Sequence, residues 1–159
     1  MLYPVATLTS VALVAFGAAH VARLARWQGH RTLSEPLVWV LHAAYAFIPL
    51  GAFALGLDQL LGNIGTAGAQ HLWMLGAIAA MTLAVMTRAT LGHTGQTLTA
   101  NRATVLIYVC LFASAFARLC ASLWLEASYV AGVLWIVTFA GFVAAYGPSL
   151  MFAAPGKKK

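Results

Sequence analysis

The sequence predicts an all-α, polytopic transmembrane helix bundle. Of its 159 residues, 62% are hydrophobic and only 8% are charged, with a mean hydropathy of +0.87; soluble domains carry about 25% charged residues. Its apolar runs have the ~20 residues that a helix needs to cross a bilayer core. None alternates with the two-residue period of a barrel strand, and helices satisfy their own backbone hydrogen bonds in lipid.

Five apolar runs are long enough to span a membrane. The expected spans are residues 4–24, 37–57, 69–91, 103–125 and 128–152. We expect one membrane domain over residues 1–156 and a basic tail over 157–159. No Lys or Arg precedes the first run, so we expect a retained span and no cleaved signal peptide.

Prolines and tryptophans add detail to these spans. Pro49 in the second span and Pro148 in the fifth each remove a helix hydrogen bond, which predicts kinks. Trp39, Trp73 and Trp124 lie near expected span ends. Because indoles settle among lipid headgroups, we expect these three side chains to anchor the spans.

Basic residues occur in alternate connections. They lie at the ends of the first, third and fifth spans or in the connections that follow: Arg23, Arg26, Arg31, Arg88, Arg102 and the three C-terminal lysines. The other connections carry only Asp58 and Glu126. The positive-inside rule therefore predicts an outside N-terminus and a cytoplasmic C-terminus. It also accounts for the net charge of +6 without a nucleic-acid partner.

Two histidines are expected at equal depth on neighbouring spans. His20 lies four residues before the end of the first span and His42 five residues after the start of the second. At ~1.5 Å per residue both lie ~6–8 Å below the cytoplasmic boundary. Two axial ligands of one haem require equal depth, and imidazole ligates haem iron and copper. Alternatively, each ring packs between helices and bonds to a hydroxyl or a carbonyl.

His71 and His93 bracket the third span. A continuous helix separates residues 22 positions apart by ~33 Å, so they cannot share a metal. His71 is a candidate ligand at the outer face. His93 lies between Gly92 and Gly95, where the helix is expected to end. Its ring either caps the helix or has a functional role.

Two arginines place charge near apolar segments. Arg88 is close enough to the cytoplasmic face to reach headgroups, a haem propionate or an anionic substrate. Arg118 lies seven residues inside the outer end of the fourth expected span. We therefore expect a partner for it, either Asp58, Glu126 or a cofactor carboxylate.

Two stretches carry recognisable motifs. Residues 41–57, LHAAYAFIPLGAFALGL, contain Leu-His and then an aromatic-Pro-Leu-Gly pattern. Residues 70–98 contain His-x4-Gly-Ala-Ile and Met-Thr-Arg-Ala-x-Leu-Gly-His-Thr-Gly. Together they resemble the later half of the NnrS family, bacterial haem- and copper-containing membrane proteins associated with resistance to nitric oxide. The resemblance implicates His42, His71, Arg88, Gly92, His93, Thr94 and Gly95.

The resemblance implies haem b and copper as cofactors, and nitric oxide or a metal-nitrosyl species as a partner. The candidate metal ligands are His42, His71 and His93. The wider set of cofactor-binding candidates is His20, His42, His71, Arg88, His93 and Arg118. The His-x-His-Glu-Met segment of that family is absent here, and Gln96 stands where a basic residue is common. We therefore expect a fragment, a truncated relative or one half of a split assembly, with a missing N-terminal half or partner subunit.

The acids Glu35, Asp58 and Glu126 lie in three separate loops or helix ends. No paired carboxylates or nucleophile–base pair is evident, so we expect a metal- or haem-binding stress-response protein instead of a hydrolase or transferase. Two other functions stay open. One is a non-haem transporter or assembly subunit; the other is an electron-transfer cytochrome with a bis-histidine haem.

Overall fold

The structure, a computed structural model, describes residues 3–61 and 66–152. Within those residues it contains helices and no strand, and five helical segments are long and apolar enough to cross a membrane. The expected all-α bundle with five spans is therefore confirmed. The basic tail over 157–159 lies outside the described residues.

The spans are formed by these elements. The chain runs through α1 (Tyr3–Arg26), the 3-10 helix η1 (Gly29–Thr32), α2 (Pro36–Leu61), α3 (Thr66–His71), the π-helix η2 (Leu72–Ala79), α4 (Ala80–His93), α5 (Arg102–Cys120) and α6 (Glu126–Phe152). The segments α3, η2 and α4 continue one another as a single span over Thr66–His93.

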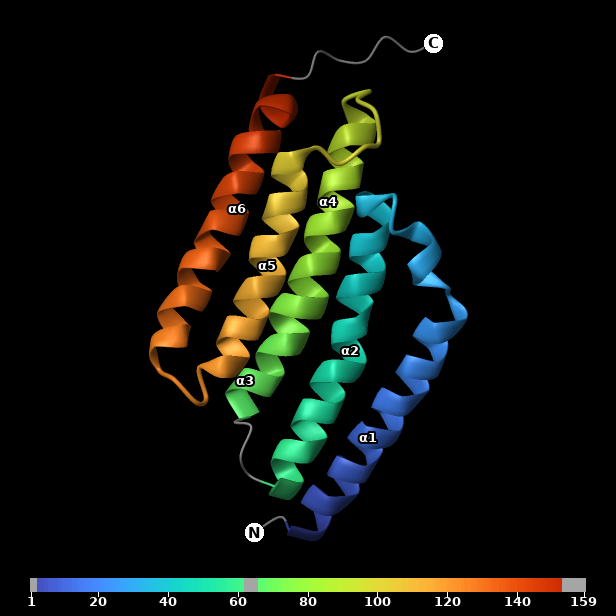
Figure 1. Cartoon of the computed structure of the whole chain (residues 1–159), viewed down its shortest axis with the longest axis vertical. Helices are drawn as coiled ribbons and strands as arrows, with labels where there is room; N and C mark the ends of the chain where they lie inside the picture. Colours follow the sequence, from blue (N-terminus) through green and yellow to red (C-terminus); the bar gives the residue numbers. More distant parts are fainter. Residues whose placement is uncertain (1–2, 62–65, 153–159) are drawn as a thin grey trace.

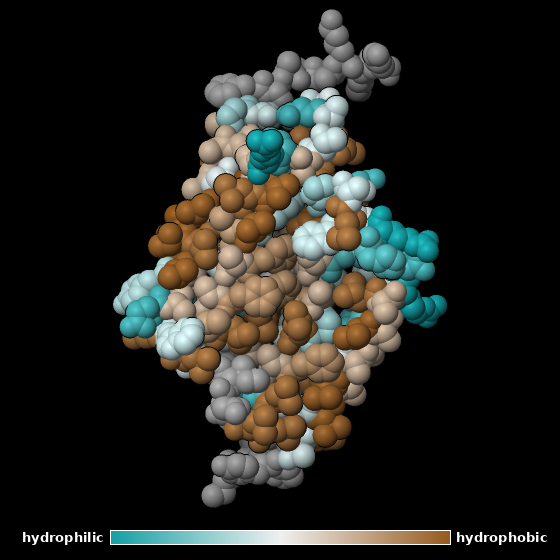
Figure 2. All heavy atoms as spheres, in the orientation of Figure 1, coloured by the Kyte–Doolittle hydropathy of each residue, from teal (hydrophilic) through white to brown (hydrophobic). Residues whose placement is uncertain are grey.

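The five spans lie side by side in chain order (Figure 1). α1 packs against α2, α2 against the third span, the third span against α5, and α5 against α6. We call the end that carries η1 and the α4–α5 connection the η1 end, and the opposite one the α3 end. Figure 2 shows hydrophobic side chains over most of the middle of the visible face, as expected for a surface that meets lipid.

Two buried polar contacts join α5 to α6. The Ser114 hydroxyl donates to the Ala131 carbonyl over 2.8 Å, and the hydroxyls of Thr104 and Tyr146 are hydrogen-bonded. Lipid provides no hydrophobic drive for helices to associate, so such hydrogen bonds help to specify which helices pack together.

The third span contains a π-helix that the sequence analysis did not predict. Gly76 in η2 packs against Phe47 of α2 so closely that a Cβ there would overlap the ring. In the same contact the Trp73 indole N–H donates to the Ile48 carbonyl over 2.7 Å. The prediction that Trp73 anchors the span among headgroups is therefore wrong, because its N–H is bonded inside the bundle.

The fourth span ends five residues earlier than expected, at Cys120 instead of residue 125. The backbone turns there, and the Ser122 hydroxyl donates a hydrogen bond to the Leu119 carbonyl over 2.8 Å. Short side-chain hydrogen bonds of this kind compete with helix propagation. As a result Arg118 lies in the last turn of α5, and its expected depth within the span is wrong.

Candidate functional site

The His42 imidazole lines a pocket between the end of α1, η1 and the first turns of α2. The pocket has a volume of about 480 Å³, within the ~300–1,000 Å³ typical of ligand and cofactor sites. Most of its walls are apolar, and its lining residues include Val21, Leu24, Leu33, Trp39 and Ala43. We call this space the His42 pocket.

The hydrogen bonds of His42 determine which ring nitrogen is available. Nδ1 lies 3.2 Å from the Val38 carbonyl oxygen, one helical turn earlier. A carbonyl can only accept, so Nδ1 carries the proton and the lone pair of the neutral ring is on Nε2. Metal-bound histidines typically have this arrangement, with the second N–H held by a carbonyl or carboxylate. The backbone at Gly29 lies against the ring, since a Cβ there would be 2.7 Å from His42 Cδ2.

The structure adds a histidine that the sequence analysis missed. His30, in η1, lines the His42 pocket. Gln28 has left-handed backbone angles (φ 52°), and the turn that follows folds η1 back over the start of α2. The sequence feature that could have indicated His30 is the short connection between the first two spans. A connection this short keeps His30 close to the ends of both helices.

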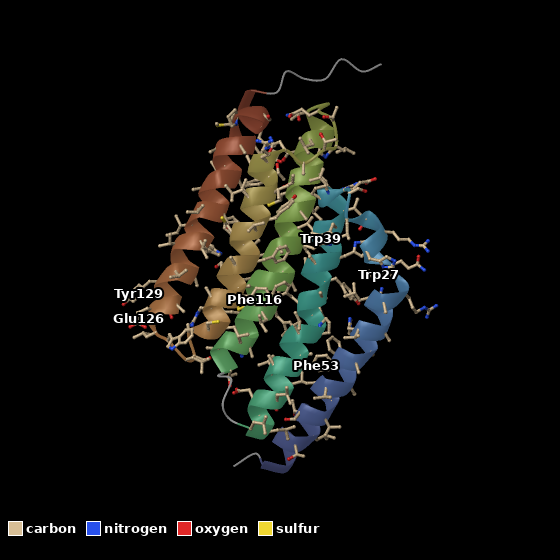
Figure 3. All side chains as sticks on the ribbon, viewed as in Figure 1. Trp27, Trp39, Phe53, Phe116, Glu126 and Tyr129 are labelled. Carbon is tan, nitrogen blue, oxygen red and sulfur yellow. The ribbon has the colours of Figure 1, made fainter. Side chains whose placement is uncertain are left out.

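His20 lies in a neighbouring aromatic cluster and does not line the His42 pocket. Its Nδ1 is 2.6 Å from the Tyr45 hydroxyl, and its ring centroid is 4.1 Å from that of Phe16. Trp27 contacts Tyr45 at 4.6 Å between centroids, beside the start of α2 (Figure 3). The contact with Tyr45 agrees with the packing alternative, and the pairing of His20 with His42 on one haem stays a prediction.

Arg88 and His93 are close in sequence but have different surroundings. Arg88 is half-buried and lines a pocket of about 430 Å³ together with Glu35. His93 is exposed and does not line that pocket. α4 ends at His93, and Gly95 follows with a left-handed φ of 69°. The expected helix end is confirmed, whereas the structure does not bring the two side chains into one pocket.

His71 and Arg118 meet at the α3 end. They line a pocket of about 280 Å³ between α3, α5 and α6, which we call the Arg118 pocket. His71 Nδ1 lies 2.6 Å from the Ala67 carbonyl, so this ring, like that of His42, presents Nε2. The His42 and Arg118 pockets are at opposite ends of the bundle and cannot serve one cofactor.

The described residues contain no group of three or more His, Cys, Asp or Glu side chains placed to hold one metal ion. The candidate ligands occur alone or as the His30 and His42 pair. Any metal bound by the described residues would therefore have at most two ligands of these four residue types.

Comparison with known proteins identifies the family. A family model described as NnrS protein matches residues 1–153. The chain belongs to the NnrS family. The match confirms the resemblance read from residues 41–57 and 70–98 and extends it through all five spans. This NnrS chain is a multi-pass membrane protein. No curated protein and no solved structure gives a significant match.

Proposed function

We propose that this NnrS chain binds haem b in the His42 pocket and acts in nitric oxide response or detoxification in a bacterial inner membrane. The observation that carries the proposal is the state of His42. Its Nδ1 proton is held by the Val38 carbonyl, and its Nε2 has no described partner at an apolar cofactor-sized pocket. Family membership supports the link to nitric oxide.

The residues of this pocket suit a haem. His42 would hold the haem iron through Nε2, with its tautomer fixed by the Val38 carbonyl and the Gly29 backbone lying against its ring. His30 lines the same pocket and would be a second candidate to hold the iron. A haem bound there would supply an iron able to bind a diatomic gas such as nitric oxide.

The other candidates have separate roles in this proposal. Arg88 lies at the η1 end, where it lines a separate pocket with Glu35, and its proposed role is to pair with a haem carboxylate. His71, at the α3 end, is the proposed copper ligand, as the family resemblance implies. His93 is exposed and lines neither pocket, so its proposed contribution is to metal capture at the surface.

An absorption spectrum of the purified chain, with haem supplied, tests the proposal. We expect a Soret band that shifts when nitric oxide is added. His42→Ala should lower haem occupancy about tenfold or more, because ligand removal costs at least as much as loss of an outer-shell partner. His93→Ala removes the same kind of side chain from an exposed position, so this variant should retain the Soret band. Equal loss in both variants would contradict the assignment to the His42 pocket.

Two further variants assign the second axial position. His30→Ala should change the coordination signature of the haem while His20→Ala leaves it unaltered; the reverse result would restore the pairing predicted from depth. A six-coordinate haem that ignores nitric oxide would favour an electron-transfer cytochrome. Absence of a Soret band even with added haem would favour a transporter or assembly subunit.

A further inference from the structure

We propose that the Arg118 pocket is a binding site for a small planar oxyanion, such as a carboxylate or an oxyanion of nitrogen. The site is separate from the His42 pocket and does not depend on haem. Three helices form it: α3 contributes His71, α5 contributes Ser114 and Arg118, and α6 contributes Ser128. Its volume of about 280 Å³ suits a small ligand.

The charge of the pocket is positive and is not neutralised by its own walls. Arg118 is half-buried and has no hydrogen-bond or ion-pair partner among the described residues. No acid lines the pocket. Asp58 accepts a hydrogen bond from Thr66 over 2.7 Å, and Glu126 lies at the outer edge of the first turn of α6 (Figure 3). Neither expected partner of Arg118 therefore occupies this site.

The remaining polar groups complement an oxyanion. A guanidinium presents parallel N–H donors that match two oxygens of a planar anion. His71 lines the pocket from another span, with its Nδ1 bonded to the Ala67 carbonyl. Ser128 adds a hydroxyl. Leu75 and Trp135 add apolar walls beside these polar groups.

The position of Arg118 at a helix end explains only part of this arrangement. A cation in the last turn of α5 is favoured by the helix dipole, and a long side chain near a span end can extend toward the headgroups. Those effects require neither a histidine from another helix nor an open volume beside the guanidinium. Gly132 keeps this volume open, since a Cβ there would meet no atom within 4 Å.

Thermal unfolding of the full chain in phosphatidylcholine nanodiscs tests the site. Sodium nitrite, nitrate or formate is compared with chloride at one ionic strength, because a ligand that binds the folded state raises the unfolding temperature by an amount that grows with the ratio of its concentration to its Kd. We expect a rise for the wild type and for Arg102→Gln, an exposed arginine at the other end of α5. Arg118→Gln should weaken binding about tenfold, the effect of removing a charged hydrogen-bonding partner.

Substitutions of glycine test the Arg118 pocket while Arg118 itself stays in place. Gly132→Leu should fill the pocket and abolish the response to the anions. Gly147→Leu, also in α6 with no atom closer than 3.7 Å to a built Cβ, should preserve it. This pair separates loss of the site from a general loss of stability.

Nanodiscs containing phosphatidylglycerol distinguish the source of the anion. A response to soluble anions in neutral lipid identifies a site for a free oxyanion. A response that appears only with phosphatidylglycerol, and only with Arg118 present, identifies the same chemistry supplied by a lipid phosphate. If Arg118→Gln and Gly132→Leu respond as the wild type does, or if no anion and no acidic lipid changes the unfolding temperature, the proposal is wrong.

Discussion

The histidine rings of this chain differ in their hydrogen-bond partners. His42 and His71 both use Nδ1 to reach the backbone carbonyl one turn earlier, at Val38 and Ala67. His20 uses the Tyr45 hydroxyl. A helical histidine can bond to the carbonyl four residues earlier in any sequence, so residue spacing does not reveal this contact. It does decide which nitrogen is available to a metal or an anion.

Gly29→Ala tests how closely the backbone holds His42. The added Cβ would lie 2.7 Å from His42 Cδ2, so the ring or η1 must move. We expect a shifted Soret band and weaker haem retention, measured on the reconstituted protein. Gly92→Ala is the control, because a Cβ there meets nothing within 4 Å. An unchanged spectrum in Gly29→Ala would mean that the ring position does not govern haem binding.

Trp73→Phe tests the hydrogen bond between the second and third spans. Loss of the indole donor leaves the Ile48 carbonyl without that partner, and we expect about 1 kcal/mol of destabilisation in a denaturant titration. Trp124 is exposed in the connection between α5 and α6, so Trp124→Phe should change the free energy of unfolding by less than about 0.5 kcal/mol. Similar values for the two variants would mean that Trp73 acts only as an interfacial side chain.

At the scale of elements, the π-helix η2 separates His71 from the polar end of α4. A π-helix has more residues per turn than an α-helix and occurs frequently near functional sites. Here it accompanies close packing of η2 on the segment of α2 that contains Pro49. The hydropathy of the third span predicts a helix but not this change of register, which occurs where Gly76 packs against the Phe47 ring of another helix.

Gly76→Ala tests this packing. Its Cβ would overlap the Phe47 ring, so we expect a loss of about 1–3 kcal/mol of stability, typical of overpacking. Unfolding in a mixed detergent series gives the free-energy difference. Gly132→Ala, whose Cβ meets open space, should be nearly neutral. A tolerated Gly76→Ala would show that η2 can relax away from α2.

At the scale of the whole molecule, five spans place the start of α1 and the end of α6 at opposite ends (Figure 1). The distribution of arginine and lysine predicts that the η1 end faces the cytoplasm. This orientation would direct the His42 pocket inward and the Arg118 pocket outward, so the two proposed sites would meet ligands from different compartments.

Cysteine labelling in intact cells tests the orientation. Cys120 is exposed at the α3 end and Cys110 is buried, so a membrane-impermeant maleimide that reaches the outer face of the inner membrane should label Cys120 without lysis. Cys120→Ser should remove the signal. Thr97→Cys in that background, at the η1 end, should react only after the membrane is permeabilised. The opposite pattern would reverse the predicted topology.

The amino-acid sequence by itself determined the class of the protein, the number of its spans and its family. These follow from apolar length and from local motifs, which need no knowledge of neighbouring helices. It also indicated the histidines worth testing. The tertiary structure decided which residues share a pocket: His30 joins His42, His71 joins Arg118, and His20 is turned toward Tyr45. Those groupings depend on side chains far apart in the chain, because packing between helices and the short turns that end them set where each ring and charge lies.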